Sequence, residues 1–403
     1  MGTEMVVPFH RPSIGQEEID EVVGTLRSGW LTTGPRTAQF EAEFRRYVQA
    51  PHALAVNSCT AGLHLALAAL GVGPGTEVIT TPLTFCATVI VIRHVNATPV
   101  LADVGEDGNI DPDSITARIT SKTRAILPVH LAGLPCDMNA IWTIARRHRL
   151  FVIEDCAHAA GSHYLGWPIG AGSPESGYYS DAAAFSFYAT KNLTTGEGGM
   201  VTTHDDNLLE TMRMLCLHGI NRDAWNRYTD RGNWFYEVLA EGFKYNLSDV
   251  QSAIGVQQLR KLEEFTAVRK RYADLYNELL GGCDLFELPT DRRESRHAWH
   301  LYMLRLNLGQ LTIGRDEFIM ALRERGIGTA VHFIPIPLHP FFAKFAERPE
   351  NHCPRALALY PRLISLPLYP AMTEQQVHYV AEAVLEVAQE ARKRPAVMVA
   401  GAD

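Results

Sequence analysis

The sequence has few cysteines, and they form no recognisable pattern. Seven are scattered over 403 residues, and no two of them are separated by only two residues. Disulfide-rich secreted domains and structural zinc sites need closely spaced or paired cysteines, so both classes are excluded. An odd number of scattered cysteines is typical of a reducing compartment, and we expect a cytoplasmic protein with no bound metal.

Long apolar runs and a surplus of basic residues are also missing. No uninterrupted hydrophobic stretch approaches the length that spans a bilayer, and residues 1–6 have neither the basic start nor the apolar core of a signal peptide. The formal net charge is −8 at pH 7, which argues against nucleic acid as a partner. We expect neither membrane nor nucleic acid as partners, and a locally positive pocket for any anionic ligand.

Short apolar runs alternate with helical patterns through the first half of the chain. Hydrophobic residues make up 46% of the sequence, which is enough for a large core. Alternation at this spacing predicts an α/β fold with a mostly parallel, seven-stranded sheet covered by helices on both faces. The candidate strands lie at 53–57, 77–80, 98–103, 124–129, 150–155, 182–187 and 199–203.

The same patterns divide the chain into three parts. Residues 1–250 should form the large domain, including an N-terminal segment. A long helical pattern predicts a linking helix over 251–282, ended by a pair of glycines. Residues 283–403 mix strand and helix patterns, and we expect them to form a smaller α+β domain.

One lysine stands where covalent catalysis is possible. Lys191 follows the apolar, strand-like run 182–190 and precedes the turn-forming glycines of 196–199. A lysine at the carboxyl end of a buried strand can form a Schiff base with an aldehyde cofactor, and Ser186 can hold that cofactor's phosphate. Most lysines at strand ends are solvated charges, so this hypothesis requires the rest of a pyridoxal phosphate site.

A second strand upstream ends in a carboxylate. The run 151–155 resembles a buried strand, and open α/β sheets place ligand-facing residues at such ends. Asp155 is the candidate partner of a pyridine nitrogen, because a carboxylate beside it stabilises the protonated ring. His158 could orient Asp155 or pack near the ring. The alternative is that Asp155 caps the next segment and His158 belongs to the core.

A phosphate cradle is predicted at the junction of the run 53–56 with the apolar helix that follows it. Free amides and the positive end of a helix dipole favour a phosphate dianion there, with Thr60 and Ala61 as donors. A simple helix cap is the alternative. Phe85 follows another strand-like run and can stack on a flat cofactor, although a lone phenylalanine more often belongs to the core.

With these pieces together, the chain resembles the DegT/DnrJ/EryC1/StrS family of pyridoxal phosphate-dependent sugar aminotransferases, which have fold type I. Several long motifs occur in the family's order and at its usual separations over most of the chain. They lie at 28–35, 57–67, 84–88, 128–133, 154–161, 185–199, 242–249 and 297–302. Cys59 and Gly62 stand where Gly and Ala are common in relatives.

The resemblance implies a role for each candidate residue. Lys191 matches the Schiff-base lysine, Asp155 the partner of the pyridine nitrogen, and Phe85 the stacking aromatic. Thr60, Ala61 and Ser186 match phosphate contacts. Asn246 matches a residue that reaches the phosphate from the neighbouring subunit, which implies a homodimer with shared active sites. The alternative from the sequence alone is that Asn246 caps the helix after it.

The resemblance also implies the reaction. Pyridoxal 5'-phosphate would take an amino group from L-glutamate, become pyridoxamine 5'-phosphate, and pass the group to a nucleotide-linked keto-deoxysugar. We expect a UDP-linked sugar aminated at C4. Two segments rich in Thr, His, Pro and aromatic residues, 29–35 and 329–340, could line the sugar site. Their candidate contacts are Trp30, Thr32, Thr33, His332 and His339.

Other functions stay open on the sequence. Amination at C3, dehydration with the same cofactor, and a non-catalytic regulator all fit the fold. The dehydratase branch is expected to replace the Schiff-base lysine with histidine, and Lys191 argues against it. A metal hydrolase built on Asp155, His158 and His163 is the unrelated alternative, but their spacing is not a recognised ligand pattern.

Overall fold

The computed structural model describes residues 5–170, 178–220, 236–289, 291–343 and 353–393. Its main sheet has seven strands in the order β1-β9-β8-β5-β4-β2-β3. The pairs β2–β3, β2–β4, β4–β5 and β5–β8 are parallel, and β9 runs antiparallel to both neighbours. The expected mostly parallel α/β sheet is confirmed. Its strands are β1 (His52–Val56), β2 (Glu77–Thr80), β3 (Thr98–Leu101), β4 (Thr123–Leu127), β5 (Phe151–Cys156), β8 (Ala182–Ser186) and β9 (Gly199–Thr203).

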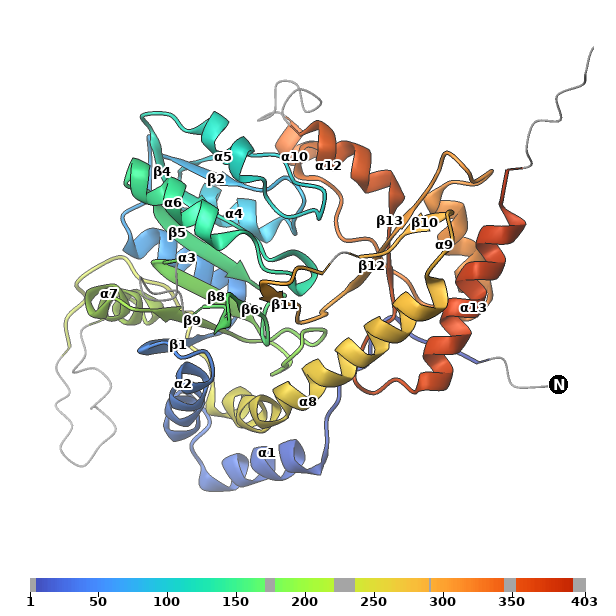
Figure 1. Ribbon diagram of the computed structural model, residues 1–403. Helices are drawn as coiled ribbons and strands as arrows, with labels where there is room; N and C mark the ends of the chain where they lie inside the picture. The colour runs from blue at the N-terminus through green and yellow to red at the C-terminus, as the bar shows by residue number, and fades with distance from the viewer. Residues whose placement is uncertain (1–4, 171–177, 221–235, 290, 344–352, 394–403) are drawn as a thin grey trace, which may run out of the picture.

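Helices cover the sheet on both faces (Figure 1). Neighbouring strand residues point to opposite faces, so Val152 and Ile153 of β5 belong to different hydrophobic clusters. Val152 packs with one set of helices, α2 (Pro35–Tyr47), α5 (Pro112–Arg118), α6 (Met138–His148) and the first half of α8 (Asp249–Leu280). Ile153 packs with the other set, α3 (Cys59–Ala69), α4 (Ala87–His94) and α7 (Asp206–Cys216).

Helix α8 has 32 residues and joins the large sheet to a second region. It contacts α1 (Gln16–Ser28) and α2 at one end and α13 (Glu374–Glu390) at the other (Figure 1). Its N-cap is Ser248, whose hydroxyl oxygen accepts from the backbone N–H of Gln251. The sequence alternative that Asn246 caps this helix is therefore wrong.

The second region is built on an antiparallel sheet with the order β10-β12-β13. The N-terminal segment joins it, because Val7 is buried in the same cluster and its N–H donates to the carbonyl of Gly326 at 2.9 Å. The elements are β10 (Phe286–Glu287), β12 (Tyr302–Leu306), β13 (Leu363–Leu366), α9 (Arg315–Glu324), α10 (Pro340–Ala343), α12 (Pro354–Leu359) and α13. A third small sheet joins β11 (Ser295–Arg296), β6 (His163–Tyr164) and β7 (Trp167–Pro168).

The segment before β12 departs from an extended strand. Trp299 has a left-handed φ of 48°, which a strand cannot contain. The flanking N–H groups of Ala298 and His300 donate to the carbonyls of Gly133 and Ala132. These bonds hold residues 297–300 against the turn 131–133, which follows β4 of the large sheet, and β12 begins only at Tyr302.

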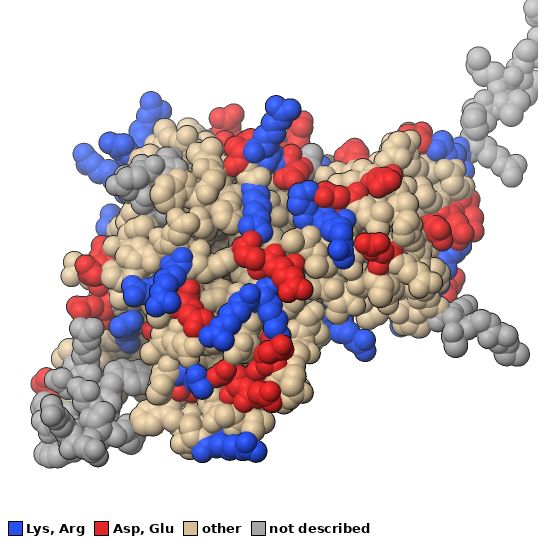
Figure 2. All heavy atoms as spheres, turned by 60° about the horizontal axis from the view of Figure 1, so that its bottom comes forward, with Lys and Arg blue, Asp and Glu red and all other residues tan. Residues whose placement is uncertain are grey.

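Charged residues of both signs lie side by side on the face shown in Figure 2. Ion pairs join α8 to its neighbours: Lys261 Nζ lies 2.8 Å from Glu18 Oε2 on α1, and Arg260 pairs with Glu43 on α2. Glu18 is only 1% exposed, so its pair with Lys261 is better protected from solvent than an ordinary surface pair. Within the described ranges, no helix is both long and apolar enough to cross a membrane.

Candidate active site

A cavity of about 480 Å³ opens at the carboxyl ends of β5 and β8. The second region and the N-terminal segment supply part of its wall, with His300, Leu368 and His10 among the contributors. Seven of the candidate residues from the sequence line this one cavity. They are Thr60, Phe85, Asp155, His158, Ser186, Lys191 and His332.

Asp155 is a buried carboxylate held by neutral donors. Oδ2 accepts from the hydroxyl of Thr88 at 2.8 Å, and Oδ1 accepts from the N–H of Ala157 at 3.1 Å. The thiol of Cys59 lies 3.8 Å from Oδ1. Burial raises the pKa of Asp155, although these hydrogen bonds and the charge of Lys191 act in the opposite direction. Such a carboxylate would be stabilised by a protonated ring nitrogen placed against it.

Lys191 lies in the turn after β8, where its N–H donates to the carbonyl of Tyr188 at 2.9 Å. Burial lowers the pKa of its ammonium group to about 8, and the charge of Asp155 only partly offsets this effect. Near neutral pH, Lys191 is therefore an unprotonated amine in a larger fraction of the protein molecules than a surface lysine would be. An unprotonated amine is the form that attacks an aldehyde.

The start of α3 has the properties of a phosphate cradle. Ser58 is its N-cap and accepts from the N–H of Ala61 at 3.1 Å, while the N–H of Thr60 has no acceptor among the described residues. A Cβ on Gly199 would lie 2.7 Å from the backbone nitrogen of Cys59. Only glycine lets β9 pass this close to the helix end. The open amide of Thr60 and the hydroxyl of Ser186 suit a phosphate.

Phe85 is 60% exposed on the cavity wall, so the alternative that it belongs to the core is wrong. Its ring centroid lies 6.1 Å from that of Phe333. An exposed aromatic face beside Asp155 and Lys191 matches what a flat cofactor ring needs for stacking. Together with the acid, the lysine and the helix end, it makes the cavity fit pyridoxal phosphate.

Three histidines form one wall of the cavity. His158 packs against His300 with ring centroids 4.3 Å apart, and His332 is joined to Ser365 by a 2.8 Å hydrogen bond. Burial lowers the pKa of His332 to about 4 and holds the pKa of His158 and His300 well below the ordinary value. The wall therefore carries neutral imidazoles at physiological pH.

Other candidates from the sequence lie outside the residues that line this cavity. Asn246 Nδ2 donates to Thr33 Oγ1 at 2.7 Å, Trp30 Nε1 donates to the carbonyl of Thr33, and the carbonyl of Thr32 accepts from the N–H of Asp249. The loop 29–35 and the segment 246–249 are thus one hydrogen-bonded unit. His339 stands just before α10 and is also absent from the cavity lining.

Sequence reasoning missed several residues of the site. Thr88 and Cys59 contact Asp155, and His10 lines the cavity while its Nε2 donates to the carbonyl of Ala189. His300 lies in the motif 297–302, but the sequence alone assigns it no role. None of these residues has a distinctive local pattern, because the partners lie between 67 and 179 positions away in the chain.

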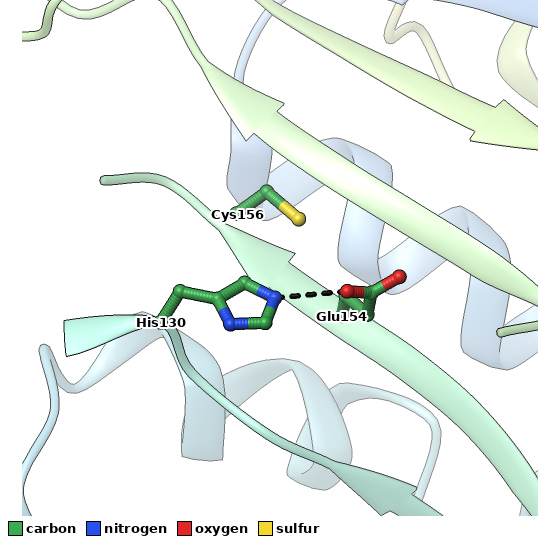
Figure 3. Close-up of side chains that lie close together, drawn as sticks. All are labelled: His130, Glu154 and Cys156. Carbon is green, nitrogen blue, oxygen red and sulfur yellow. Dashed lines mark hydrogen bonds and ion pairs between the residues drawn. The ribbon is translucent and has the colours of Figure 1, made fainter. Parts of the chain in front are cut away.

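A buried group elsewhere resembles a metal site in composition. His130, Glu154 and Cys156 place one ligand atom each within 4.8 Å of one another (Figure 3). However, His130 Nδ1 accepts from the N–H of Cys136, so Nε2 carries the proton and donates to Glu154 at 2.9 Å. The other Glu154 oxygen accepts from Ser180. With no free lone pair on the imidazole, the group is a hydrogen-bonded support for β5.

The metal hydrolase alternative finds no support in the described chain. Asp155 and His158 line the cavity, but His163 belongs to β6 in the small third sheet and does not. Among the described residues, the group around His130 is the only cluster of three potential metal ligands.

Comparison with known proteins gives a consistent result. The model of the DegT/DnrJ/EryC1/StrS aminotransferase family matches residues 12–385. The spore coat polysaccharide biosynthesis protein SpsC of Bacillus subtilis is 48% identical over 383 residues, covering 94% of this chain and 97% of that protein. An uncharacterized protein of Methanocaldococcus jannaschii is 48% identical over 390 residues, covering 96% of this chain and 99% of that protein.

Solved structures agree with the sequence matches. Spr1654 of Streptococcus pneumoniae, described as a sugar aminotransferase, has a structure in its PMP form with a TM-score of 0.88 and 33% identity. That match covers 95% of this chain and 99% of Spr1654, and a PLP form of the protein is also known. Helicobacter pylori PseC, an aminotransferase of pseudoaminic acid biosynthesis, has a TM-score of 0.88 at 28% identity, covering 96% of this chain and all of PseC (100%).

Proposed function

The chain belongs to the DegT/DnrJ/EryC1/StrS aminotransferase family, and we propose that it transfers an amino group from L-glutamate to C4 of a UDP-linked keto-deoxysugar. The main support for this proposal is that one cavity holds both Lys191 and the buried carboxylate of Asp155. The pKa of Lys191 is lowered to about 8. The cofactor is pyridoxal 5'-phosphate, which supplies an electron sink for the bond made or broken at the substrate carbon.

Asp155 keeps that sink effective. Its carboxylate is the acid in the cavity that lies buried at the end of β5, and Thr88 and Ala157 fix both oxygens in place. A cationic ring nitrogen against these oxygens is stabilised in the protonated form. A role as a local cap does not account for both oxygens of Asp155, because Oδ2 accepts from Thr88 of α4 and not from the chain that follows Asp155.

Lys191 has two tasks at one atom. Its Nζ would hold the aldehyde of the cofactor and, as a free amine, would take up and return the proton of the donor's α-carbon. A pKa of about 8 suits this exchange, because the amine gains and loses a proton readily near neutral pH.

The phosphate is assigned to the start of α3. The open amide of Thr60 and the hydroxyl of Ser186 would be direct donors, and the amide of Ala61 could replace its bond to Ser58 with a bond to phosphate. Phe85 would stack on the face of the cofactor ring. His158 stands beside Asp155 with its Nδ1 fixed by the N–H of Ala132.

We assign Asn246 to the site of a second subunit in a homodimer. Asn246 and the loop that holds it lie outside the lining of their own cavity, yet their polar atoms are aligned by Thr33. Leu26, Trp30 and Leu31 are exposed beside this unit. An exposed apolar patch of this kind suits burial against another copy of the chain. Trp30, Thr32, Thr33 and His339 would then meet the sugar nucleotide at the shared site.

One experiment tests the reaction and its acceptor. The protein is incubated with L-glutamate and a panel of UDP- and dTDP-linked 4-keto and 3-keto sugars, and products are identified by mass spectrometry. We expect amination of the UDP-linked 4-keto sugar. Amination of 3-keto sugars alone would replace C4 with C3, and loss of water without gain of an amine would indicate a dehydratase. A yellow protein without any turnover would favour a regulator.

A further inference from the structure

The side-chain amide of Asn192, next to the catalytic lysine, is hydrogen-bonded inside the protein through both its nitrogen and its oxygen. Its Nδ2 donates to the carbonyl oxygens of Ala298 at 2.9 Å and Ala160 at 3.3 Å. Its Oδ1 lies 3.0 Å from Nδ1 of His300. Because two carbonyl oxygens require the NH₂ group, the oxygen of the amide must be the atom that faces His300.

This amide fixes the tautomer of His300. An amide oxygen only accepts, so Nδ1 of His300 carries the proton and donates it. Burial is the main cause that holds the pKa of His300 well below its ordinary value, and the charges of Lys191 and Arg269 add to it. The ring is therefore neutral, and its second nitrogen, Nε2, carries a lone pair.

Nε2 is the ring nitrogen of His300 that Asn192 leaves free. It has no hydrogen-bond partner among the described residues. It is also not one of their buried side-chain atoms that lack a partner, so it is accessible to solvent. The residue lines the cavity together with Lys191. Its lone pair is thus open to a ligand.

The other two imidazoles of the wall offer the opposite group. His158 Nδ1 accepts from the N–H of Ala132, which leaves a proton on Nε2. The hydroxyl of Ser365 has no other acceptor among the described residues, so it donates to His332 Nδ1 and again leaves a proton on Nε2. Of these three histidines, His300 therefore offers a hydrogen-bond acceptor at Nε2, whereas His158 and His332 each offer an N–H donor.

We propose that His300 Nε2 accepts a hydrogen bond from the hydroxyl at C3 of the sugar, beside the carbon that is aminated, and so selects sugars that carry it. This inference rests on the proposed sugar-nucleotide aminotransferase function. A neutral acceptor suits an uncharged hydroxyl group, whereas a carboxylate of the amino donor would be repelled by the lone pair. Asn192 is a positioning residue, because it acts on the sugar only through His300.

Two substitutions at His300 separate the two nitrogens. In His300→Asn the amide nitrogen can replace Nδ1 and keep the bond to Asn192, but nothing replaces Nε2. In His300→Gln the longer side chain can bring its amide oxygen to the place of Nε2. The control is His297→Asn, because His297 lies in the same segment, stacks on Trp299 at 4.1 Å and is absent from the cavity lining.

The measurement is binding, by calorimetry, to the cofactor-loaded enzyme. The probes are a UDP-linked 6-deoxyhexose with a hydroxyl at C4, which cannot be aminated, and its 3-deoxy analogue. We expect wild type and His297→Asn to prefer the 3-hydroxy probe by about 3- to 10-fold, the usual value of one neutral hydrogen bond. His300→Asn should lose this preference, and His300→Gln should retain part of it.

The outcomes separate the two proposals. Equal binding of both probes by wild type, or an unchanged preference in His300→Asn, would overturn the role of His300 while leaving the aminotransferase intact. Failure of wild type to bind either probe would remove the UDP-sugar proposal and this inference with it. In protein labelled with ¹⁵N-histidine, the signals lost in His300→Asn should show an unprotonated Nε2, and a protonated Nε2 would contradict the tautomer assigned to the ring.

Discussion

The hydroxyl of Thr88, on α4, donates to Oδ2 of Asp155, on β5, across 2.8 Å. The hydroxyl of Thr84 lies 2.8 Å from that of Thr88 and completes a short buried chain toward the carboxylate. A hydrogen bond to a charged group contributes about 1.5–3 kcal/mol. Thr88→Val should therefore slow the conversion of the enzyme by L-glutamate, followed by absorbance, about 10- to 150-fold. Thr88→Ser keeps the donor and should lose much less, and equal losses in both variants would contradict the assignment.

Replacing Asp155 removes the negative charge at the ring nitrogen. Asp155→Asn preserves the shape, yet it should reduce transamination by orders of magnitude, because the protonated ring loses its stabilising partner. Cofactor phosphate binding, measured by equilibrium dialysis, should largely survive through Thr60 and Ser186. Near-normal turnover of the variant would require another electron-sink partner.

Borohydride reduction of the yellow protein should attach the cofactor covalently to Lys191, and peptide mass mapping locates it. Lys191→Ala should still bind pyridoxamine phosphate while turnover is lost, because binding and proton transfer are separate tasks of the site. Label on another lysine would refute the assignment.

The lowered pKa of Lys191 predicts a pH dependence of stability in cofactor-free protein. Burial lowers this pKa from 10.5 to about 8, so between these values the unfolded chain binds more protons and folding becomes more favourable as pH rises. Lys191→Met removes the buried charge. Its gain in the free energy of unfolding over wild type should be largest below pH 8 and should shrink toward pH 10 in urea titrations. A difference that stays constant from pH 6 to 10 would show that the pKa is unshifted.

Shared sites predict complementation between two inactive homodimers. Lys191→Ala inactivates the site that contains this lysine, and Asn246→Asp places a carboxylate against the phosphate in the opposite site. Random subunit exchange should give one intact site in each heterodimer and restore about a quarter of wild-type activity. Heterodimers without activity would contradict a site shared through Asn246, provided that Asn246→Asp alone is inactive.

Regular elements were predictable wherever the pattern of the sequence determined them. The candidate strands 77–80 and 199–203 coincide with β2 and β9. The run 299–306 has a strand-like pattern, but β12 begins only at Tyr302, because tertiary hydrogen bonds to Ala132 and Gly133 hold Trp299 in a left-handed conformation. Local pattern carries no information about such bonds.

The residues of the site were likewise predictable only where a local sequence pattern marks them. Lys191, Asp155 and Thr60 stand at strand ends and at a helix start, which the sequence marks, and the structure brings them to one cavity. His300 and Thr88 act through partners that are distant in the chain, so only the fold identifies them. Ala61 is the intermediate case. The sequence allowed either a phosphate cradle or a simple helix cap at this helix start, and in the structure the amide of Ala61 bonds to the N-cap Ser58.

The bonds around the lysine turn also limit how the enzyme can open. Asn192 ties this turn to Ala298, and His10 ties Ala189 to the N-terminal segment that is buried with the second region. A hinge motion that swung the second region away from the large sheet would break these bonds and displace the lysine with them. The catalytic geometry therefore depends on the two regions staying together, and an exchange of donor for acceptor that keeps this geometry requires access to the cavity without their separation.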